Sequence, residues 1–319
     1  MLAIADEQLA DFRADVLAGL SSATPAIPAR WLYDSTGSEL FDAITRVPAY
    51  YPTRTETALL RQVMPQIAER VPARTAVVEF GAGSQTKTPI LLEAIQPAAY
   101  VPVDISGDYL ELSAAQIDDS FRKLPVFPVT ADFTRPLNLP DQIRDLHKLG
   151  FFPGSTIGNF VPRSATDLLR HFRDLLGTGA LLLIGLDRIK PVDRLIAAYD
   201  DPEGTTACFN LNLLHRINRE LDGDIPIDAF RHEARWNDLL SRIEMHLVAT
   251  RQVGFTIAGK RFEFAAGSSI HSENSHKYEQ RGARLLLLAG GWTPLAEWAD
   301  DAGDFAIVLA EAQPLRFAP

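Results

Sequence analysis

The chain has 319 residues, 46% of them hydrophobic and 23% charged, which is enough to bury the core of one large domain or two interlocked ones. Its net charge of −10 argues against a nucleic-acid partner, because binding to phosphates requires a basic surface. The only cysteine, Cys208, cannot form an internal disulfide. There is no basic leader and no apolar run of membrane-spanning length, so we expect a cytoplasmic protein without a membrane partner.

The first seventy residues predict two helices separated by an aromatic segment. Apolar residues at helical spacing give an amphipathic first helix, namely Leu9, Phe12, Val16 and Leu20. Thr53 and Glu56 have the spacing of a capping box, so we expect Thr53 to cap the second helix and Glu56 to reach back to it. Pro65 is predicted to kink or break that helix.

From residue 75 the pattern alternates between short apolar strands and helices. Strands are predicted at 77–80, 100–104, 126–129, near 151 and at 181–184, and a helix capped near Ser164 ends at Gly177. Continuous apolar strands joined by helices predict a parallel sheet that is covered on both faces. Near the end of the chain, a helix and two strands fit an antiparallel hairpin that closes such a sheet.

The segment from about 191 to 276 has a different pattern. Helices are predicted at 193–199 and 209–221, a strand at 243–247, and a hairpin at 255–264 that turns at Gly259. We interpret this segment as an insertion that packs with the N-terminal region. The predicted domains are residues 1–60 plus 191–284, and residues 61–190 plus 285–319.

A glycine loop follows the strand at 77–80. Gly81 and Gly83 lack Cβ atoms where the backbone must approach a ligand, and the next helix brings free N–H groups to the loop. The dinucleotide fingerprint has a third glycine where this chain has Thr86. The loop therefore favours a single adenosine-type ligand, such as S-adenosylmethionine (SAM), over NAD.

Polar residues end the following strands of the predicted sheet. Asp104 lies about twenty residues past the loop, where such folds place an acceptor for ribose hydroxyls. Asp132 is predicted to accept from the adenine amino group, with a turn acid as the alternative. Phe133 beside it is a candidate contact or a core ring. Asn159 offers a donor and an acceptor to a substrate, with a turn asparagine as the alternative.

Several motifs occur together over nearly the whole chain, at 33–41, 50–56, 79–88, 154–159, 198–200, 209–210, 243–245 and 273–275. In this combination the sequence resembles the histidine-specific Nα-methyltransferases of ergothioneine biosynthesis. That family uses SAM to trimethylate the α-amine of L-histidine and so gives hercynine. The resemblance implies an α/β fold, namely a class I SAM-dependent methyltransferase (Rossmann-like) sheet with an inserted α+β substrate-binding domain.

Residue by residue, the resemblance also implies roles. The cofactor contacts would be Gly81, Gly83, Lys87, Asp104, Asp132 and Phe133. Tyr33, Asn159 and Tyr199 would hold the amino-acid end of the substrate. The imidazole pocket would consist of Tyr50, Met245, Glu273 and Ser275. Tyr33 and Asn159 are the predicted catalytic residues, with Tyr33 a candidate acceptor of the amine proton.

Plainer interpretations of these residues stay open. Glu273 lies in the polar segment 270–278, where exposed acids are usual, and the tyrosines and Met245 would by default be core residues. His246, His271 and His276 suggest a metal cluster, but their spacing does not support zinc, so no metal is predicted.

Two other functions compete with histidine methylation. One is methylation of another amino acid, such as tyrosine or tryptophan, and the presence of both Met245 and Glu273 argues against it. The other is non-catalytic SAM binding. We expect a monomer whose partners are small molecules, namely L-histidine and its mono- and dimethyl forms.

Overall fold

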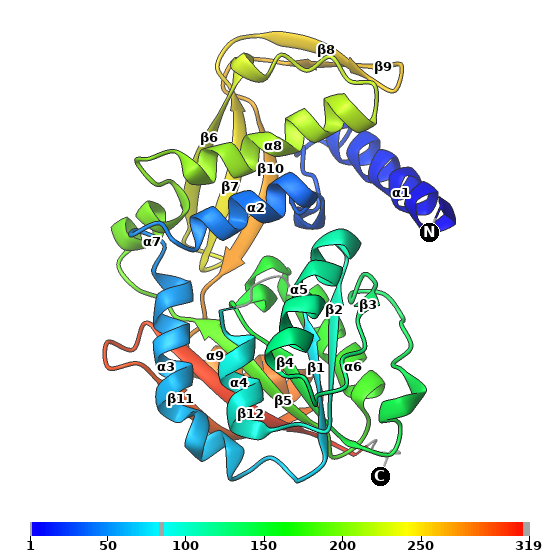
Figure 1. The fold of residues 1–319 in the computed structure, drawn as a ribbon. Coiled ribbons are helices and arrows are strands. Elements are labelled where there is room, and N and C mark those ends of the chain that lie inside the picture. The colour runs from blue at the N-terminus through cyan, green and yellow to red at the C-terminus, as the bar shows by residue number, and fades with distance from the viewer. Residues whose placement is uncertain (1, 83–85, 315–319) are drawn as a thin grey trace, which may run out of the picture. The chain divides into compact units, whose positions relative to one another are not determined.

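The computed structural model describes residues 2–82 and 86–314. Contacts divide the chain into two compact units (Figure 1). The insertion unit comprises Met1–Tyr50 and Pro191–Ser275, and the sheet unit comprises Tyr51–Lys190 and His276–Pro319. The polypeptide therefore passes between the units at 50/51, 190/191 and 275/276.

The sheet unit is built on seven strands, in the order β11-β12-β5-β4-β1-β2-β3 (Figure 1). These strands are β1 (Thr75–Phe80), β2 (Ala99–Asp104), β3 (Val129–Thr130), β4 (His147–Phe152), β5 (Leu181–Asp187), β11 (Trp292–Ala299) and β12 (Phe305–Ala312). The first five are parallel to one another, whereas β12 runs antiparallel to both β5 and β11. The structure thus confirms the predicted parallel sheet and its closing antiparallel hairpin.

Helices cover both faces of this sheet. α3 (Tyr51–Ala68), α4 (Thr88–Ile95) and α5 (Gly107–Ser120) bury their apolar sides on one face, together with Val77 of β1. α6 (Pro162–Leu176) and α9 (Gln280–Ala289) cover the other face, together with Val78 and Phe80. Phe80 stacks on Phe172 of α6 with ring centroids 3.8 Å apart. Short 3₁₀ turns, η2 (Asp141–Ile143) and η3 (Thr156–Asn159), flank β4.

The insertion unit has a three-stranded sheet in the order β10-β7-β6, formed by β6 (Phe230–Asn237), β7 (Arg242–Ala249) and β10 (Ser269–His276). α7 (Val192–Tyr199) and α8 (Thr205–Glu220) pack on β6 and β7, and α2 (Ser35–Ile44) packs on α8. Asp34 caps α2 and also accepts from Asn212 of α8 at 2.8 Å. The remaining elements are α1 (Leu2–Leu20), η1 (Ala29–Leu32), η4 (Ile227–Ala229) and the hairpin of β8 (Val253–Ile257) and β9 (Lys260–Phe264).

Two local predictions about helices are wrong, and a third is wrong in part. α3 begins at Tyr51, so Thr53 lies inside its first turn, and Glu56 is buried instead of reaching back to a cap. The same helix continues through Pro65, so the predicted break does not occur, because the buried apolar face holds the helix beyond the proline, and the alternative, a kink at Pro65, stays a prediction. α6 begins at Pro162 with Val161 as its N-cap, and not at Ser164, because proline favours the first helical turn.

The strand predictions also differ from the structure. The strand expected at 126–129 is reduced to β3, with Val126 forming an isolated bridge, since Pro128 has no N–H for the ladder. β6 and β10 were not predicted. Their core-facing positions include polar residues, His232 and Ser272, which obscure the apolar alternation. No helix in the described part of the chain is long and apolar enough to cross a membrane.

Candidate active site

Four predicted substrate residues form two hydrogen-bonded pairs in the insertion unit. Tyr33, which follows η1, donates to Glu273 Oε1 over 3.2 Å. Tyr199, at the end of α7, hydrogen bonds to Ser275 Oγ over 2.7 Å. Tyr50 packs edge-on against Tyr199 with ring centroids 5.8 Å apart. The fold thus brings together side chains that lie up to 240 residues apart in the sequence.

The environment of Tyr33 is aromatic and acidic. Its ring packs edge-on against Phe41 and Phe209, at centroid distances of 5.6 and 5.4 Å. Burial first, and then the charge of Glu273, raise the pKa of Tyr33 well above 10. The hydroxyl therefore keeps its proton at neutral pH and is a donor to Glu273.

A buried asparagine on α8 connects the elements of this group. Asn210 is 0% exposed, and its Nδ2 donates to His232 Nδ1 over 2.8 Å and to the carbonyl of His246 over 3.2 Å. Its Oδ1 accepts from Ser272 Oγ over 2.6 Å. Ser272 also donates to the carbonyl of Met245, whose side chain is 2% exposed. One amide thus joins α8 to β6, β7 and β10.

The glycine loop of the sheet unit is tied to the end of β2. Gly81 has φ 78°, and its N–H and that of Ala82 donate to the carbonyl of Val103. A side chain at Gly81 would be strained by this positive φ. Phe133 packs edge-on against Phe80 with ring centroids 6.3 Å apart. Gly83 lies outside the described residues.

Two acids follow neighbouring strands of the sheet. Asp104 ends β2, and its Oδ1 accepts from Ser106 N over 2.8 Å. Burial raises the pKa of Asp104 to about 6, although hydrogen bonds from the backbone N–H groups of Ser106 and Ile105 oppose the shift. Asp132 Oδ1 accepts from the backbone N–H of Thr134 over 2.9 Å, which is the contact of a turn acid. A contact between Asp132 and adenine stays a prediction.

A buried ion pair joins the start of α4 to α3, and its carboxylate also binds the loop that follows β4. Lys87 Nζ pairs with Glu56 of α3, and the two side chains are 6% and 2% exposed. Glu56 also accepts from Gly154 N over 2.8 Å. Gly185 of β5 makes room for this carboxylate, since a Cβ there would lie 2.0 Å from Glu56 Oε1. A cofactor contact of Lys87 stays a prediction.

The loop that carries Asn159 has an uncommon backbone. Gly154 and Ser155 are both left-handed, with φ 80° and 56°, and non-glycine residues in this conformation, such as Ser155, are often found at functional sites. Ser155 Oγ accepts from Asp187 N over 2.9 Å. His276 Nδ1 donates to the carbonyl of Gly158 over 2.8 Å. The backbone that leads to Asn159 is therefore held at two points, Ser155 and Gly158.

Asp187, at the end of β5, binds one residue near each of the three points where the chain passes between the units. It is 0% exposed and accepts from Tyr51 Oη, Lys190 Nζ and Lys277 Nζ over 2.7, 2.5 and 2.7 Å. Burial alone would raise the pKa of Asp187, but the charges of Lys277 and Lys190 outweigh it and hold that pKa below its usual value. The partners lie next to the points where the chain enters or leaves the sheet unit.

Comparison with known proteins identifies the family. A family model described as "Histidine-specific methyltransferase, SAM-dependent" matches residues 12–312. The chain belongs to this family. The protein named histidine N-alpha-methyltransferase from Mycolicibacterium smegmatis is 39% identical over 312 residues, which cover 96% of each chain. Its namesake from Mycobacterium tuberculosis is 39% identical over 304 residues, covering 93% of this chain and 94% of that one.

A relative with a different printed name also matches. The 4-dimethylallyltryptophan N-methyltransferase of Claviceps purpurea is 26% identical over 319 residues, covering 92% of each chain. The predicted resemblance, enzyme class and use of SAM are confirmed by the family match, which spans both units of this histidine-specific methyltransferase.

Sequence reasoning missed several residues that organise the two units of this methyltransferase. The sequence pattern assigns Glu56 to a capping box, and Asn210 appears in it only as part of the motif at 209–210. Both occupy the apolar stripe of a helix: Glu56 precedes Leu59 and Leu60 by three and four residues, as Asn210 precedes Leu213 and Leu214. A polar residue at a core position of a helical repeat is the signal that could have found them.

Proposed function

We propose that this methyltransferase transfers three methyl groups from SAM to the α-amine of L-histidine, giving hercynine in the first step of ergothioneine biosynthesis. The observation that carries the proposal is the match of residues 12–312 to the histidine-specific family. Identity of 39% to two proteins named histidine N-alpha-methyltransferase, over nearly their whole length, supports it.

The insertion unit would supply most of the histidine contacts. Tyr33, Tyr199 and Asn159 are proposed to bind the amino-acid end of the substrate, because these groups offer hydrogen bonds without adding charge. Glu273 and Ser275 would serve the two imidazole nitrogens. The pairs that join Tyr33 to Glu273 and Tyr199 to Ser275 support this assignment, since they connect groups proposed for both ends of one small substrate. The ring of Tyr50 and the side chain of Met245 would complete the imidazole pocket.

The sheet unit would bind the methyl donor through Gly81, Gly83, Lys87, Asp104, Asp132 and Phe133. The positions of Gly81 and Asp104 support an adenosyl ligand. Gly81 makes a left-handed turn at the carboxyl end of β1, and Asp104 stands at the carboxyl end of β2, which is where parallel sheets bind nucleotides. Lys87 would act through its ion pair with Glu56, which fixes the start of α4.

A sulfonium methyl is electrophilic without further activation, so methyl transfer requires no nucleophilic residue and no metal. The task of the chain is to hold a neutral amine in line with that methyl, and proximity supplies most of the acceleration. Tyr33 and Asn159 would orient the amine. Because the hydroxyl of Tyr33 is protonated at neutral pH, it would accept the amine proton by passing its own proton on, to water or to Glu273.

The test is incubation of the purified protein with labelled SAM and single amino acids, with products identified by mass spectrometry. Three successive methyl additions to histidine alone are expected. Transfer only to tyrosine or tryptophan would instead support a related amino-acid methyltransferase, a candidate that the similarity to the Claviceps purpurea protein favours. SAM binding without transfer to any amino acid would contradict both. A cytoplasmic location and a monomeric state stay predictions, and gel filtration tests the latter.

A further inference from the structure

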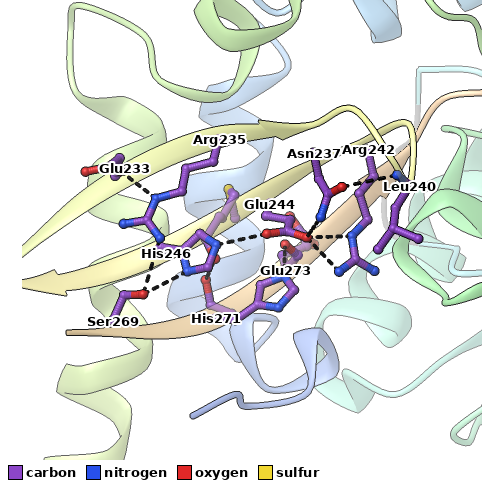
Figure 2. Close-up of polar contacts among 12 residues, drawn as sticks. Glu233, Arg235, Asn237, Leu240, Arg242, Glu244, His246, Ser269, His271 and Glu273 are labelled. Atoms are coloured by element: carbon purple, nitrogen blue, oxygen red, sulfur yellow. Dashed lines mark hydrogen bonds and ion pairs between the residues drawn. The ribbon is translucent and has the colours of Figure 1, made fainter. Parts of the chain in front are cut away.

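Three side chains of metal-ligand type converge on one face of the insertion-unit sheet. Glu244 and His246 lie on β7, and His271 lies on the neighbouring β10 (Figure 2). One ligand atom from each side chain lies within 4.8 Å of the other two. The two imidazole rings are stacked, with centroids 4.9 Å apart and an interplanar angle of 18°. Strand alternation places this group on the face of β7 opposite to Met245.

Each histidine of the group has a partner for the ring nitrogen that would not bind a metal. His271 Nε2 donates to the carbonyl of Glu273 over 3.0 Å, which makes Nδ1 the nitrogen with the lone pair. His246 Nδ1 lies 3.2 Å from Ser269 Oγ, and its Nε2 faces Glu244 Oε2 over 3.3 Å. Histidines that bind metals almost always donate their other N–H to such oxygen atoms.

The protonation states are also those that a metal requires. Burial lowers the pKa of His246 to about 4 and also lowers that of His271. Burial alone would raise the pKa of Glu244, but hydrogen bonds from Arg242, Asn237 and His246 outweigh it and set that pKa to about 2. At neutral pH the group therefore presents two neutral imidazoles and one carboxylate.

The neighbouring charges restrict which cations would bind. Arg242 and Asn237 both donate to Glu244 Oε1, at 2.6 and 2.9 Å, which leaves Oε2 directed at His246 (Figure 2). Arg235 is paired with Glu233 over 2.5 Å. These arginines weaken the attraction of the site for cations that rely on carboxylate charge, such as Mg²⁺ and Ca²⁺. Ions that bind imidazole strongly, such as Zn²⁺, Ni²⁺ and Cu²⁺, are affected less.

We propose that Glu244 Oε2, His246 Nε2 and His271 Nδ1 bind one divalent transition-metal ion, such as Zn²⁺, and so cross-link β7 to β10. On binding, His246 changes tautomer without a net loss of a proton: its single proton moves from Nε2 to Nδ1, where it is donated to Ser269 Oγ, and Nε2 presents its lone pair to the ion. Metal–ligand bonds of about 2.0–2.2 Å bring ligand atoms to within about 3.5 Å of one another, so small side-chain rotations close the site. The ion is separate from methyl transfer, and its direct effect is on the stability of the insertion unit.

The experiment uses tag-free, chelator-treated protein titrated with Zn²⁺, followed by calorimetry and by the midpoint of thermal unfolding. We expect one ion per chain and a midpoint that rises with Zn²⁺ concentration, because the ion binds the folded state. Co²⁺ as a probe should give the absorption of a site with nitrogen and oxygen ligands, and Mg²⁺ should give no shift.

Matched variants locate the site. His246→Gln and His271→Gln, each of which keeps a polar side chain, should abolish binding of the ion and the Zn²⁺-dependent rise of the thermal midpoint. His215→Gln and Cys208→Ser change exposed residues elsewhere and should keep both. Metal-free unfolding curves show which variants fold. A wild-type protein that binds no Zn²⁺, or a folded His246→Gln/His271→Gln variant that still binds one ion per chain, would overturn the proposal.

Discussion

The side chains of Asn210 and His232 fix each other's hydrogen-bonding roles over a distance of 2.8 Å. His232 Nε2 lies 2.7 Å from the carbonyl of Tyr199, which can only accept, so the ring carries its proton on Nε2. Nδ1 is then an acceptor, and the amide of Asn210 supplies its donor. Burial lowers the pKa of His232 and so keeps this neutral tautomer. The position of Tyr199 in the proposed substrate site thus depends on a residue of α8.

Asn210→Ala should weaken both the fold and the binding of histidine. It leaves His232 Nδ1 buried without a donor, at a cost of about 1–3 kcal/mol in the free energy of unfolding. Urea unfolding measures this cost, and steady-state kinetics should show a raised KM for histidine with an unchanged Kd for SAM. Asn212→Ala, on the same helix, removes only a bond to Asp34 and is the matched control. Wild-type stability and wild-type KM in Asn210→Ala would rule out this positioning role.

Glu273→Ala should lower kcat/KM for histidine at least tenfold. The reason is that hydrogen bonds to charged groups contribute about 1.5–3 kcal/mol, and this variant removes the acceptor proposed for the imidazole. Tyr33→Phe removes the donor to Glu273 and should lower kcat/KM as well. Because the two residues are hydrogen bonded, the effects should be non-additive in a double-mutant cycle. An unchanged kcat/KM in Glu273→Ala would contradict the proposal that Glu273 accepts a hydrogen bond from the substrate imidazole.

Asp187→Ala should be among the most destabilising single changes in the protein. Removing one partner of a buried charge pair costs about 3–5 kcal/mol, and here two lysines lose their counter-charge. Tyr51→Phe, which removes one neutral donor to the same carboxylate, should cost about 1 kcal/mol. Urea unfolding measures the free energy of unfolding of both variants. Equal losses of free energy would show that Asp187 is not needed to stabilise the buried charges of Lys190 and Lys277.

The same residue predicts acid sensitivity. Its folded-state pKa lies below the ordinary value of 3.8, so its contribution to stability is fully present above that value and is lost as the pH falls through the folded pKa. Stability measured between pH 5 and pH 3 should fall less steeply in Asp187→Asn than in the wild type. Parallel curves would show that other carboxylates determine acid unfolding.

Glu79 should make the protein less stable as the pH rises from about 5 to 8. Burial raises the pKa of Glu79 from 4.5 to about 7, against hydrogen bonds from Tyr100 and Thr88. The folded state therefore binds a proton that the unfolded state releases, and stability falls as the pH rises through this range. Each pKa unit corresponds to about 1.4 kcal/mol, so the total is of the order of 3 kcal/mol.

Unfolding of the wild type and of Glu79→Gln in urea, at several pH values, measures this effect. The glutamine keeps an acceptor oxygen for Tyr100 and Thr88 but does not titrate, so its stability should change less between pH 5 and pH 8. If both proteins show the same pH dependence, Glu79 is ionised in the fold and the prediction fails.

Affinity for SAM should decrease below about pH 6. We propose that Asp104 accepts from the ribose hydroxyls as a carboxylate, and burial raises its pKa to about 6. Binding therefore favours the ionised form, which is lost as the pH falls through this value. Calorimetric titration of SAM between pH 5 and pH 8 measures the dependence, and Asp104→Asn should bind more weakly with a flatter profile. A wild-type Kd that is constant across pH 6 would contradict the role.

The sheet could be predicted because its signals are local. Apolar strands alternate with helices, and Asp104 follows its strand by sequence adjacency alone, so topology rules bring such residues to one edge. β10 could not be predicted in this way. Seven of its eight residues are polar, and the plainer interpretation of Glu273 is an exposed acid, yet its side chain is buried and receives a hydrogen bond from Tyr33. The hydrogen-bond donor to this buried carboxylate, Tyr33, lies 240 residues away in the chain.

The sequence by itself determined the fold class, the family and the residue types that the proposed reaction needs, since each depends on a short-range pattern or on the motifs that carry the resemblance to the family. Only the tertiary structure decided how polar groups in the core are satisfied. Glu56, Asn210 and Asp187 each bond to segments remote in sequence, because a buried polar atom must find a partner wherever the packed chain provides one. The convergence of Glu244, His246 and His271 was decided in the same way, by the pairing of two strands that no local pattern specifies.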